Sequence, residues 1–131
     1  MSAIENSRLN AVAGAPRALL RLEGAALLAA AVGAYSAYQG SWLLFALLFL
    51  APDLSFAAYA ASARVGALFY NALHSTLAPL ALLAAALALG EPLPRDIALI
   101  WIAHVGFDRG MGYGLKYSTA FGHTHLGRIG K

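Results

Sequence analysis

The sequence predicts an all-α integral membrane protein, an antiparallel up-and-down four-helix bundle with a kink at Pro52. Of its 131 residues, 60% are hydrophobic and only 11% are charged, whereas soluble domains carry about a quarter charged residues. The apolar residues form four runs, each long enough to cross a bilayer. We therefore expect a single transmembrane domain, 1–131, with spans at 17–38, 41–63, 69–89 and 95–113 and a cytoplasmic tail at 114–131.

The first span contains the segment GAALLAAAVGA, in which small residues recur at every fourth position. This spacing lets helix backbones approach closely in lipid, where apolar burial does not drive helices together. Two series qualify, Ala25–Ala29–Gly33 and Ala26–Ala30–Ala34. The turn that follows, YSAYQGSW, carries tyrosine and tryptophan residues that are typical of a membrane interface.

The later spans contain helix-breaking residues. The second span meets Pro52 just before Asp53, and a proline inside a helix removes a backbone hydrogen bond, so we expect a kink that directs the Asp53 carboxylate. The third span contains Pro79, a second position for a bend. The fourth begins after the segment EPLP and ends at the glycines of GMGYG.

The distribution of basic residues orients the bundle. Most Lys and Arg residues lie before span one, between spans two and three, or after span four, whereas the opposite face carries only Arg95. By the positive-inside rule, we expect a multi-pass membrane protein with both termini in the cytoplasm. The expected partners are the membrane and its lipids, and no nucleic acid is expected. A homo-oligomer is possible, because four short spans leave little room for transport by alternating access within one copy.

Five ionisable residues lie within these apolar helices: Glu23, Asp53, His74, His104 and Asp108. At ~1.5 Å per residue, they lie roughly 15–24 Å from the non-cytoplasmic ends of their spans. Ionisable side chains are costly in hydrocarbon and normally face a partner, an ion or a cavity. Their matching depth predicts one polar site that opens toward the cytoplasmic interface.

Four of these residues, Asp53, His74, His104 and Asp108, are the predicted metal ligands. His104 and Asp108 are spaced i, i+4 and so project from one helix face. Because the chain has no cysteine, nitrogen and oxygen atoms would hold the ion. Two histidines and two carboxylates suit a divalent transition metal, with zinc preferred. Glu23 is the candidate catalytic residue, as a base acting on metal-bound water, unless it is a further ligand or supports one.

Three other interpretations of the same cluster stay open. The polar side chains could form an interhelical network that only fixes the bundle, or they could line a proton or ion pathway. The third alternative is haem ligation by His74 and His104, although the neighbouring carboxylates would sit awkwardly near a porphyrin.

Further residues are candidates for supporting a ligand or binding substrate. They are Asn71, Arg109, Lys116 and Tyr117. Arg109 is either an interfacial arginine, its apolar stem in lipid, or a clamp for a lipid phosphate. The tail histidines His123 and His125 are either solvated or close over the metal from outside.

Two resemblances add to this interpretation. The stretches RLEG (21–24), LFLAPDLS (48–55), RVGALFYNALH (64–74), IWIAHVGFDRGMGYGLKY (100–117) and HTHLGRIG (123–130) resemble a bacterial family of small four-span membrane proteins, known only as a domain of unknown function. More loosely, the order Pro-Asp, His, then H-x-x-x-D is similar to membrane-bound metal-dependent hydrolases and zinc-dependent phospholipases C. That similarity also implies Asp53, His74, His104 and Asp108 as ligands, although this chain lacks the hydrolases' His-Arg element and is far shorter than a phospholipase.

The sequence therefore predicts a membrane-embedded, metal-dependent hydrolase that acts on a lipid or lipid-linked (phospho)ester near the cytoplasmic interface. The alternative is a non-enzymatic membrane protein, an ion or proton carrier or a scaffold, in which the buried polar cluster is structural.

Overall fold

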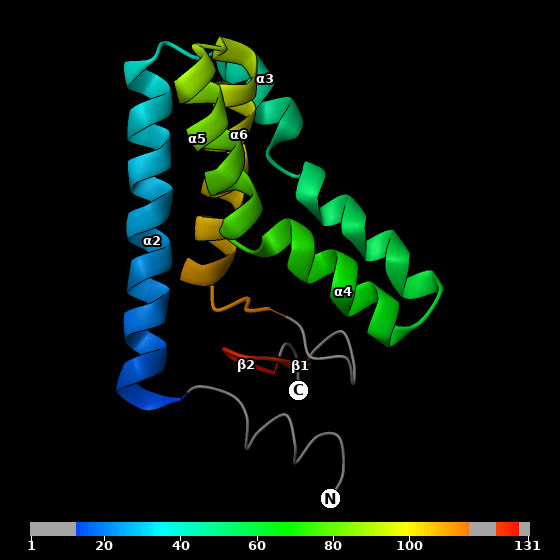
Figure 1. The fold of residues 1–131 in the computed structure, drawn as a ribbon. Helices are drawn as coiled ribbons and strands as arrows, with labels where there is room; N and C mark the ends of the chain where they lie inside the picture. Colours follow the sequence, from blue (N-terminus) through cyan, green and yellow to red (C-terminus); the bar gives the residue numbers. More distant parts are fainter. Residues whose placement is uncertain (1–12, 116–122, 129–131) are drawn as a thin grey trace, which may run out of the picture.

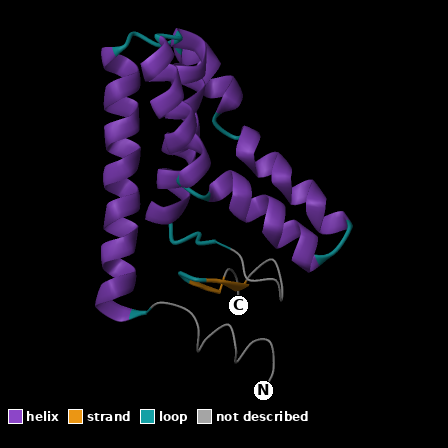
Figure 2. Ribbon diagram, viewed as in Figure 1, coloured by secondary structure: helices purple, strands orange, loops and turns teal. Residues whose placement is uncertain are grey.

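The structure, a computed structural model, describes residues 13–115 and 123–128 (Figure 1). As predicted, the described chain is mainly helical (Figure 2). The helices are α2 (Gly14–Ala37), α3 (Trp42–Leu48), the 3₁₀-helix η1 (Ala51–Ala60), α4 (Ala63–His74), α5 (Leu77–Leu89) and α6 (Pro92–Gly110). In the tail, β1 (His123–Thr124) pairs antiparallel with β2 (Gly127–Arg128), a short hairpin that the sequence pattern does not indicate.

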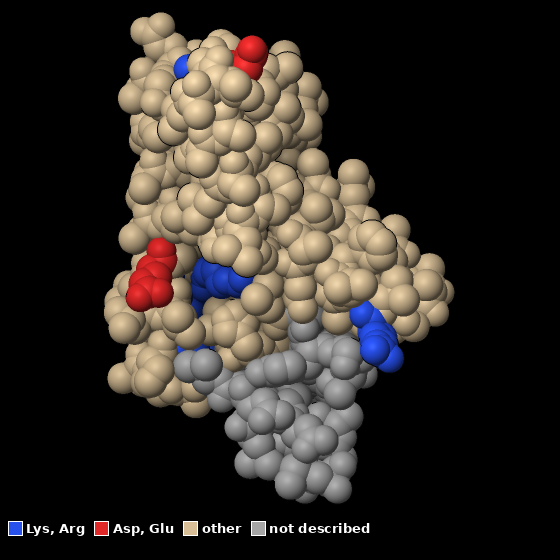
Figure 3. Space-filling model, viewed as in Figure 1, with Lys and Arg blue, Asp and Glu red and all other residues tan. Residues whose placement is uncertain are grey.

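Three segments are long and apolar enough to cross a membrane: Gly14–Ala37, Trp42–Ala60 and Ala63–Leu89. Their outer faces expose large apolar side chains, such as Leu43 at 71% and Leu77 at 79%, and such surfaces require apolar surroundings. In the space-filling view, the charged side chains lie at one end and in the opposite half, with an uncharged band between them (Figure 3). The structure is therefore compatible with a membrane protein.

The segment predicted as the fourth span is the central helix of the described fold. α6 packs against α2, α5 and α3, and its buried residues include His104 and Asp108. Two contacts define its alignment with α2. The Arg21 Nε donates to the Gly110 carbonyl over 3.0 Å, and the Arg95 guanidinium lies 4.1 Å from the centre of the Tyr38 ring. The start of α2 thus lies beside the end of α6, and its end beside the start of α6.

The tightest approach of α2 to α6 lies at Gly24, which belongs to neither small-residue series predicted from the sequence. Both series lie on exposed or partly exposed positions of α2. The buried residues of α2 are instead Gly24, Ala31 and Tyr35. The partner helix decided which face of α2 is covered, because several faces of this alanine-rich helix are small enough to pack.

Glycines allow the two backbones to approach at this contact. A Cβ at Gly24 would lie 2.3 Å from the Cβ of Arg109, and one at Gly106 would lie 2.7 Å from the backbone nitrogen of Leu28. Real Cβ atoms do not come so close to backbone atoms. Gly24 and Gly106 are therefore required where α2 crosses α6, as close helix packing in lipid requires small residues.

Two interruptions in the middle of the chain position the site. α3 ends at Leu48 and η1 begins at Ala51, with Pro52 in its first turn. α4 ends at His74, because Ser75 has an extended backbone with ψ 153°. This second break lies before Pro79, which belongs to the first turn of α5.

The segment between these interruptions forms an arm. η1 and α4 pack against each other and extend away from α2, α5 and α6 (Figure 1). Residues 64–68, which the sequence analysis left between the second and third spans, belong to α4, whose start is capped by the Ser62 hydroxyl accepting from the Val65 amide at 3.0 Å. The first turn of η1 and the last turn of α4 both meet α6, and these two turns carry Asp53 and His74.

Candidate metal centre

Three helical elements bring the four predicted ligands together. Asp53 lies in the first turn of η1, His74 ends α4, and His104 and Asp108 lie one turn apart on α6. The side chains of both histidines are 1% exposed, and that of Asp108 is 11% exposed. The side chain of Asp53 is 30% exposed, so the cluster is closed on three sides and accessible beside Asp53.

The ligand atoms of the four residues lie within 4.8 Å of one another. The two Nε2 atoms of His74 and His104 are 3.0 Å apart. Asp53 Oδ1 lies 3.1 Å from the first and 3.2 Å from the second. Asp108 Oδ2 lies 3.3 Å from both. Each carboxylate oxygen therefore lies almost equally far from the two imidazole nitrogens, and the ligand atoms of the two carboxylates lie within 4.8 Å of each other.

The nitrogen–nitrogen and nitrogen–oxygen separations are close to those of a four-coordinate metal site. Zinc binds histidine nitrogen and carboxylate oxygen at ~2.0–2.2 Å in a tetrahedral arrangement, which separates neighbouring ligand atoms by about 3.3–3.6 Å. The observed separations of 3.0–3.3 Å are therefore slightly short of those of a filled shell. The Asp53, His74, His104 and Asp108 group could hold a metal ion, as the sequence predicted.

The hydrogen bond of the His74 imidazole decides which of its ring nitrogens presents a lone pair to the cluster. Its Nδ1 lies 2.9 Å from the Tyr70 carbonyl, so Nδ1 carries the proton that it donates, a tautomer that we assign from this geometry. The Tyr70 ring also stacks on the imidazole, with centroids 3.7 Å apart. Nε2 consequently presents a lone pair to the cluster, and a backbone carbonyl behind the imidazole is the usual support of a metal-binding histidine.

The centre of the cluster consequently needs a proton or a metal ion between its acceptor atoms. The His74 Nε2 lone pair faces another imidazole nitrogen and two carboxylate oxygens within 3.3 Å. Acceptor atoms at this distance repel one another unless a proton or a metal ion lies between them. A divalent cation would balance the two carboxylates and leave the buried site neutral, whereas unbalanced buried charges are costly.

Residues 17–129 match the family described as a domain of unknown function, DUF4260. The chain belongs to this family. The match spans all five predicted site residues, Glu23, Asp53, His74, His104 and Asp108, and it confirms the predicted relationship to an uncharacterised family. The family match does not include the predicted similarity to hydrolases. No curated protein and no solved structure matches this DUF4260 chain.

The structure does not bring Glu23 into the metal-ligand cluster of the DUF4260 chain. Glu23 is exposed and lines a separate cavity of ≈ 260 Å³ between α2, α6, the α4–α5 connection and the tail hairpin. Its polar lining residues are Glu23, Thr76, Arg109 and His125, and we call this cavity the polar pocket. Arg109 of the polar pocket and the predicted ligand His104 both lie on α6, little more than one helical turn apart.

The other predicted supporting residues occupy different positions. Arg109 donates from Nη2 to the His74 carbonyl over 3.0 Å, so it supports a ligand through the backbone. Asn71 is half-buried on α4, one turn before His74. Lys116 and Tyr117 lie outside the described residues, as does the side chain of His123. His125 is not part of the cluster, since its Nδ1 accepts a hydrogen bond from the Leu115 amide at 2.8 Å.

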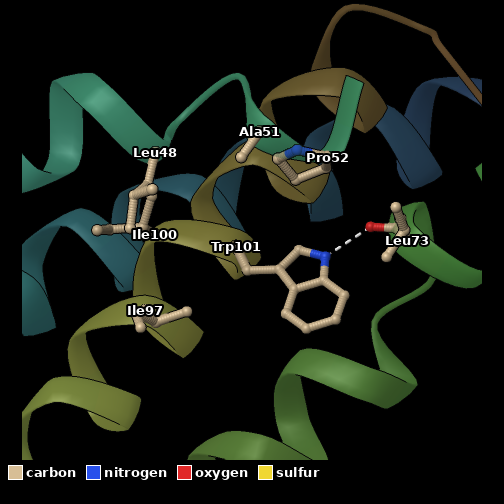
Figure 4. Close-up of a pocket in the computed structure, with 7 residues that line it drawn as sticks. All are labelled: Leu48, Ala51, Pro52, Leu73, Ile97, Ile100 and Trp101. Atoms are coloured by element: carbon tan, nitrogen blue, oxygen red, sulfur yellow. Dashed lines mark hydrogen bonds between the residues drawn. The ribbon is translucent and has the colours of Figure 1, made fainter. Parts of the chain in front are cut away.

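A second cavity, lined by apolar residues, has a volume of ≈ 210 Å³ (Figure 4). Pro52 and Leu73 line it, and they directly precede the ligands Asp53 and His74 in the chain. The indole of Trp101 projects into this region and donates from Nε1 to the Leu73 carbonyl (Figure 4). Trp101 thereby ties α6 to the last turn of α4.

Sequence reasoning missed Tyr70 and Trp101. Both lie near predicted ligands, Tyr70 four residues before His74 and Trp101 three residues before His104. An aromatic residue one turn from a buried histidine is a usable signal. It is weak, because aromatic residues are common in apolar helices.

Proposed function

We propose that this chain is a membrane-embedded metalloenzyme that hydrolyses a lipid or lipid-linked (phospho)ester near the cytoplasmic interface of the bacterial inner membrane. It would bind one divalent transition metal, zinc by preference, through Asp53, His74, His104 and Asp108. The observation that carries the proposal is the cluster of two imidazole nitrogens and two carboxylate oxygens, in which the nitrogens lie 3.0 Å apart and each oxygen lies 3.1–3.3 Å from both of them. Such a metal lowers the pKa of a bound water to about 7 and stabilises developing negative charge.

Access to the cluster favours catalysis over a purely structural metal. A structural zinc site is closed, whereas a catalytic site needs a position for water or substrate and can expand to five ligands. Asp53 is the ligand beside which such a molecule can enter, because its side chain is 30% exposed while the histidines are 1% exposed.

The surroundings of the cluster support a lipid substrate. The apolar cavity of ≈ 210 Å³ is larger than the ~150 Å³ apolar cavity that binds benzene in an engineered protein, so it suits part of a hydrocarbon chain. The polar pocket contains Arg109, which donates to the carbonyl of His74 in the cluster. A lipid could therefore place its ester at the metal, with its chain in the apolar cavity and its headgroup in the polar pocket.

Glu23 is not assigned the role of general base in this proposal. A base must come within hydrogen-bond reach of the water that it deprotonates, and Glu23 is exposed and faces the polar pocket. Asp53, the most exposed of the four ligands, is better placed to accept a proton from a water that enters beside it.

The proposed topology has four antiparallel spans with both termini in the cytoplasm, bent before Pro52 so that η1 presents Asp53 to α6. Because the chain has no cysteine, single introduced cysteines test this arrangement. Glu91→Cys should react with an impermeant maleimide in intact cells, whereas Ala61→Cys should react only after lysis. The reverse pattern would overturn the orientation.

The decisive experiment combines metal analysis with an activity assay. After purification without chelators, we expect about one zinc or other transition-metal ion per chain by elemental analysis. Metal-dependent release of product from short-chain phospholipids should follow, and His104→Ala should abolish both. Stoichiometric metal without hydrolysis of any lipid ester would favour the non-enzymatic alternative, and absence of metal would favour a structural polar network.

A further inference from the structure

The polar pocket brings groups of opposite charge to one cavity without joining them. Glu23 lies on α2, Arg109 on α6 and His125 in the tail, and all three line the same ≈ 260 Å³ space. No ion pair connects Glu23 to any residue in the part of the chain that the structure describes. Opposite charges that face a shared cavity but not each other indicate a ligand that carries both charges.

One part of the pocket lining supplies hydrogen-bond donors. Arg109 has five N–H groups, of which one donates to the His74 carbonyl at 3.0 Å and one approaches the Tyr113 carbonyl at 3.4 Å. The structure gives no further hydrogen bond of Arg109 within residues 13–115 and 123–128, and its guanidinium carries the positive charge that an anionic group needs. Arginine binds phosphate well because its planar fork matches phosphate oxygens.

His125 adds a neutral donor to the same lining. Burial, with a smaller contribution from Arg109, lowers the pKa of His125 below its ordinary value of 6.5, so the imidazole is neutral at pH 7. Its Nδ1 accepts from the Leu115 amide, which leaves the proton on Nε2. His125 therefore offers one N–H donor, and the Thr76 hydroxyl can complement it.

Glu23 supplies the opposite chemistry. Its ionised carboxylate only accepts hydrogen bonds, and it would repel a simple anion held by Arg109. A simple cation would in turn be repelled by Arg109. A ligand with a phosphate and an ammonium group satisfies both residues and leaves no group opposed by a like charge.

We propose that the polar pocket binds a zwitterionic aminoalkyl-phosphate headgroup, with its phosphate at Arg109 and His125 and its ammonium at Glu23. The source is a membrane lipid such as phosphatidylethanolamine, because two of the segments that line the pocket, Gly14–Ala37 and Ala63–Leu89, are long and apolar enough to cross a membrane. The inference rests on the proposed function, since the headgroup would belong to the lipid whose ester reaches the metal. Arg109 connects the two sites, as it follows the ligand Asp108 and donates to the His74 carbonyl.

The test is a binding measurement that needs no turnover. The full-length protein as purified in detergent is titrated with non-hydrolysable diether phosphonate analogues of phosphatidylethanolamine and of phosphatidylglycerol, and each Kd is measured by calorimetry. We expect the zwitterionic lipid to bind about tenfold more tightly, a difference of about 1.4 kcal/mol. Glu23→Gln should reduce this ratio to less than about twofold, by weakening the zwitterionic lipid and strengthening the anionic one.

Glu91→Gln is the matched control, because Glu91 is an exposed acid at the opposite end of α6, and it should retain the wild-type ratio. Equal binding of the two lipids by the wild type, or a wild-type ratio in Glu23→Gln, would overturn the proposal. Free phosphoethanolamine should compete only weakly. If it bound as tightly as the lipid, the assignment to a lipid headgroup would be wrong.

The headgroup proposal and the proposed function fail separately. Headgroup preference without metal or hydrolysis would leave the pocket assignment intact and remove the enzyme. Hydrolysis with no preference between the two lipids would support the enzyme and contradict the assignment of the pocket to a headgroup.

Discussion

The Nε2 atoms of His74 and His104 lie 3.0 Å apart although the residues are separated by 30 positions in the chain. Both imidazoles are buried, and the Tyr70 carbonyl holds the His74 ring in the tautomer that exposes its Nε2 lone pair to His104. Two imidazole nitrogens can face each other so closely only with a cation or a shared proton between them. Five predictions follow from this contact, from the glycines beside it and from the tail.

Replacing the ligands should lower metal content unequally. His104→Ala removes a buried ligand and should weaken metal binding by more than the ~10–100-fold that is typical for loss of a mere supporting partner. Asp53→Ala should cause a smaller loss, because water can reach this 30% exposed position and replace the carboxylate. Metal per chain is measured by mass spectrometry, with His125→Ala as the control that retains it. Full metal content in His104→Ala would place the metal elsewhere.

Arg109 should support the metal centre without binding the metal. Its Nη2 donates to the His74 carbonyl, so Arg109→Gln should weaken metal affinity by about 10–100-fold and leave the number of sites unchanged. The affinity is measured by competition with a chromogenic chelator. A variant with wild-type affinity would show that this hydrogen bond does not position His74.

Removal of the metal should destabilise the fold. A ligand that binds only the folded state stabilises it by about 2.7 kcal/mol at 100 times its Kd, and the metal would join η1, α4 and α6. We expect a chelator to lower the Tm in detergent and added zinc to restore it. The same treatment should not change the Tm of His104→Ala. A chelator effect of equal size in that variant would contradict the assignment.

The glycines of α6 and α2 offer a matched pair of substitutions. Gly106→Ala would place a Cβ 2.7 Å from the Leu28 nitrogen and 2.8 Å from the Gly24 carbonyl oxygen, so it should destabilise the protein by about 1–3 kcal/mol through overpacking. Gly33→Ala meets nothing within 4 Å and should be neutral or stabilise by up to about 1 kcal/mol through helix propensity. Thermal unfolding in detergent measures both. Equal effects would show that the α2–α6 approach is looser than described.

Acidification should release the tail at His125. Its pKa is lowered in the folded state, chiefly by burial, so folding favours the neutral imidazole. The stabilisation is complete above the ordinary pKa of about 6.5 and is lost as the pH falls from there through the lowered value. Protonation of Nδ1 also removes the acceptor of the Leu115 amide.

Hydrogen exchange at the Leu115 amide, corrected for the intrinsic effect of pH, should therefore accelerate between pH 7.5 and 5. The amide of Val105, buried within α6, serves as the internal reference. Unchanged protection of Leu115 at pH 5 would show that His125 does not hold the tail.

The sequence was sufficient to predict the helical class and the clustering of Asp53, His74, His104 and Asp108. Long apolar runs have few folded solutions in lipid, and ionisable residues within them must converge because isolated charges are costly there. The i, i+4 spacing of His104 and Asp108 needs only a continuous helix, which α6 provides. Asp53 and His74 followed from residue type and matching depth.

Tertiary structure decided which helix faces meet and where Glu23 points. The alanine-rich α2 offered several equivalent small-residue faces, and only packing against Gly106 of α6 selected the face that contains Gly24 and Ala31. This rotation leaves Glu23, next to Gly24, on the polar pocket instead of the metal cluster. Helix arithmetic gives the depth of a residue, whereas its direction depends on the rotation of each helix, which is set by contacts between residues far apart in the chain.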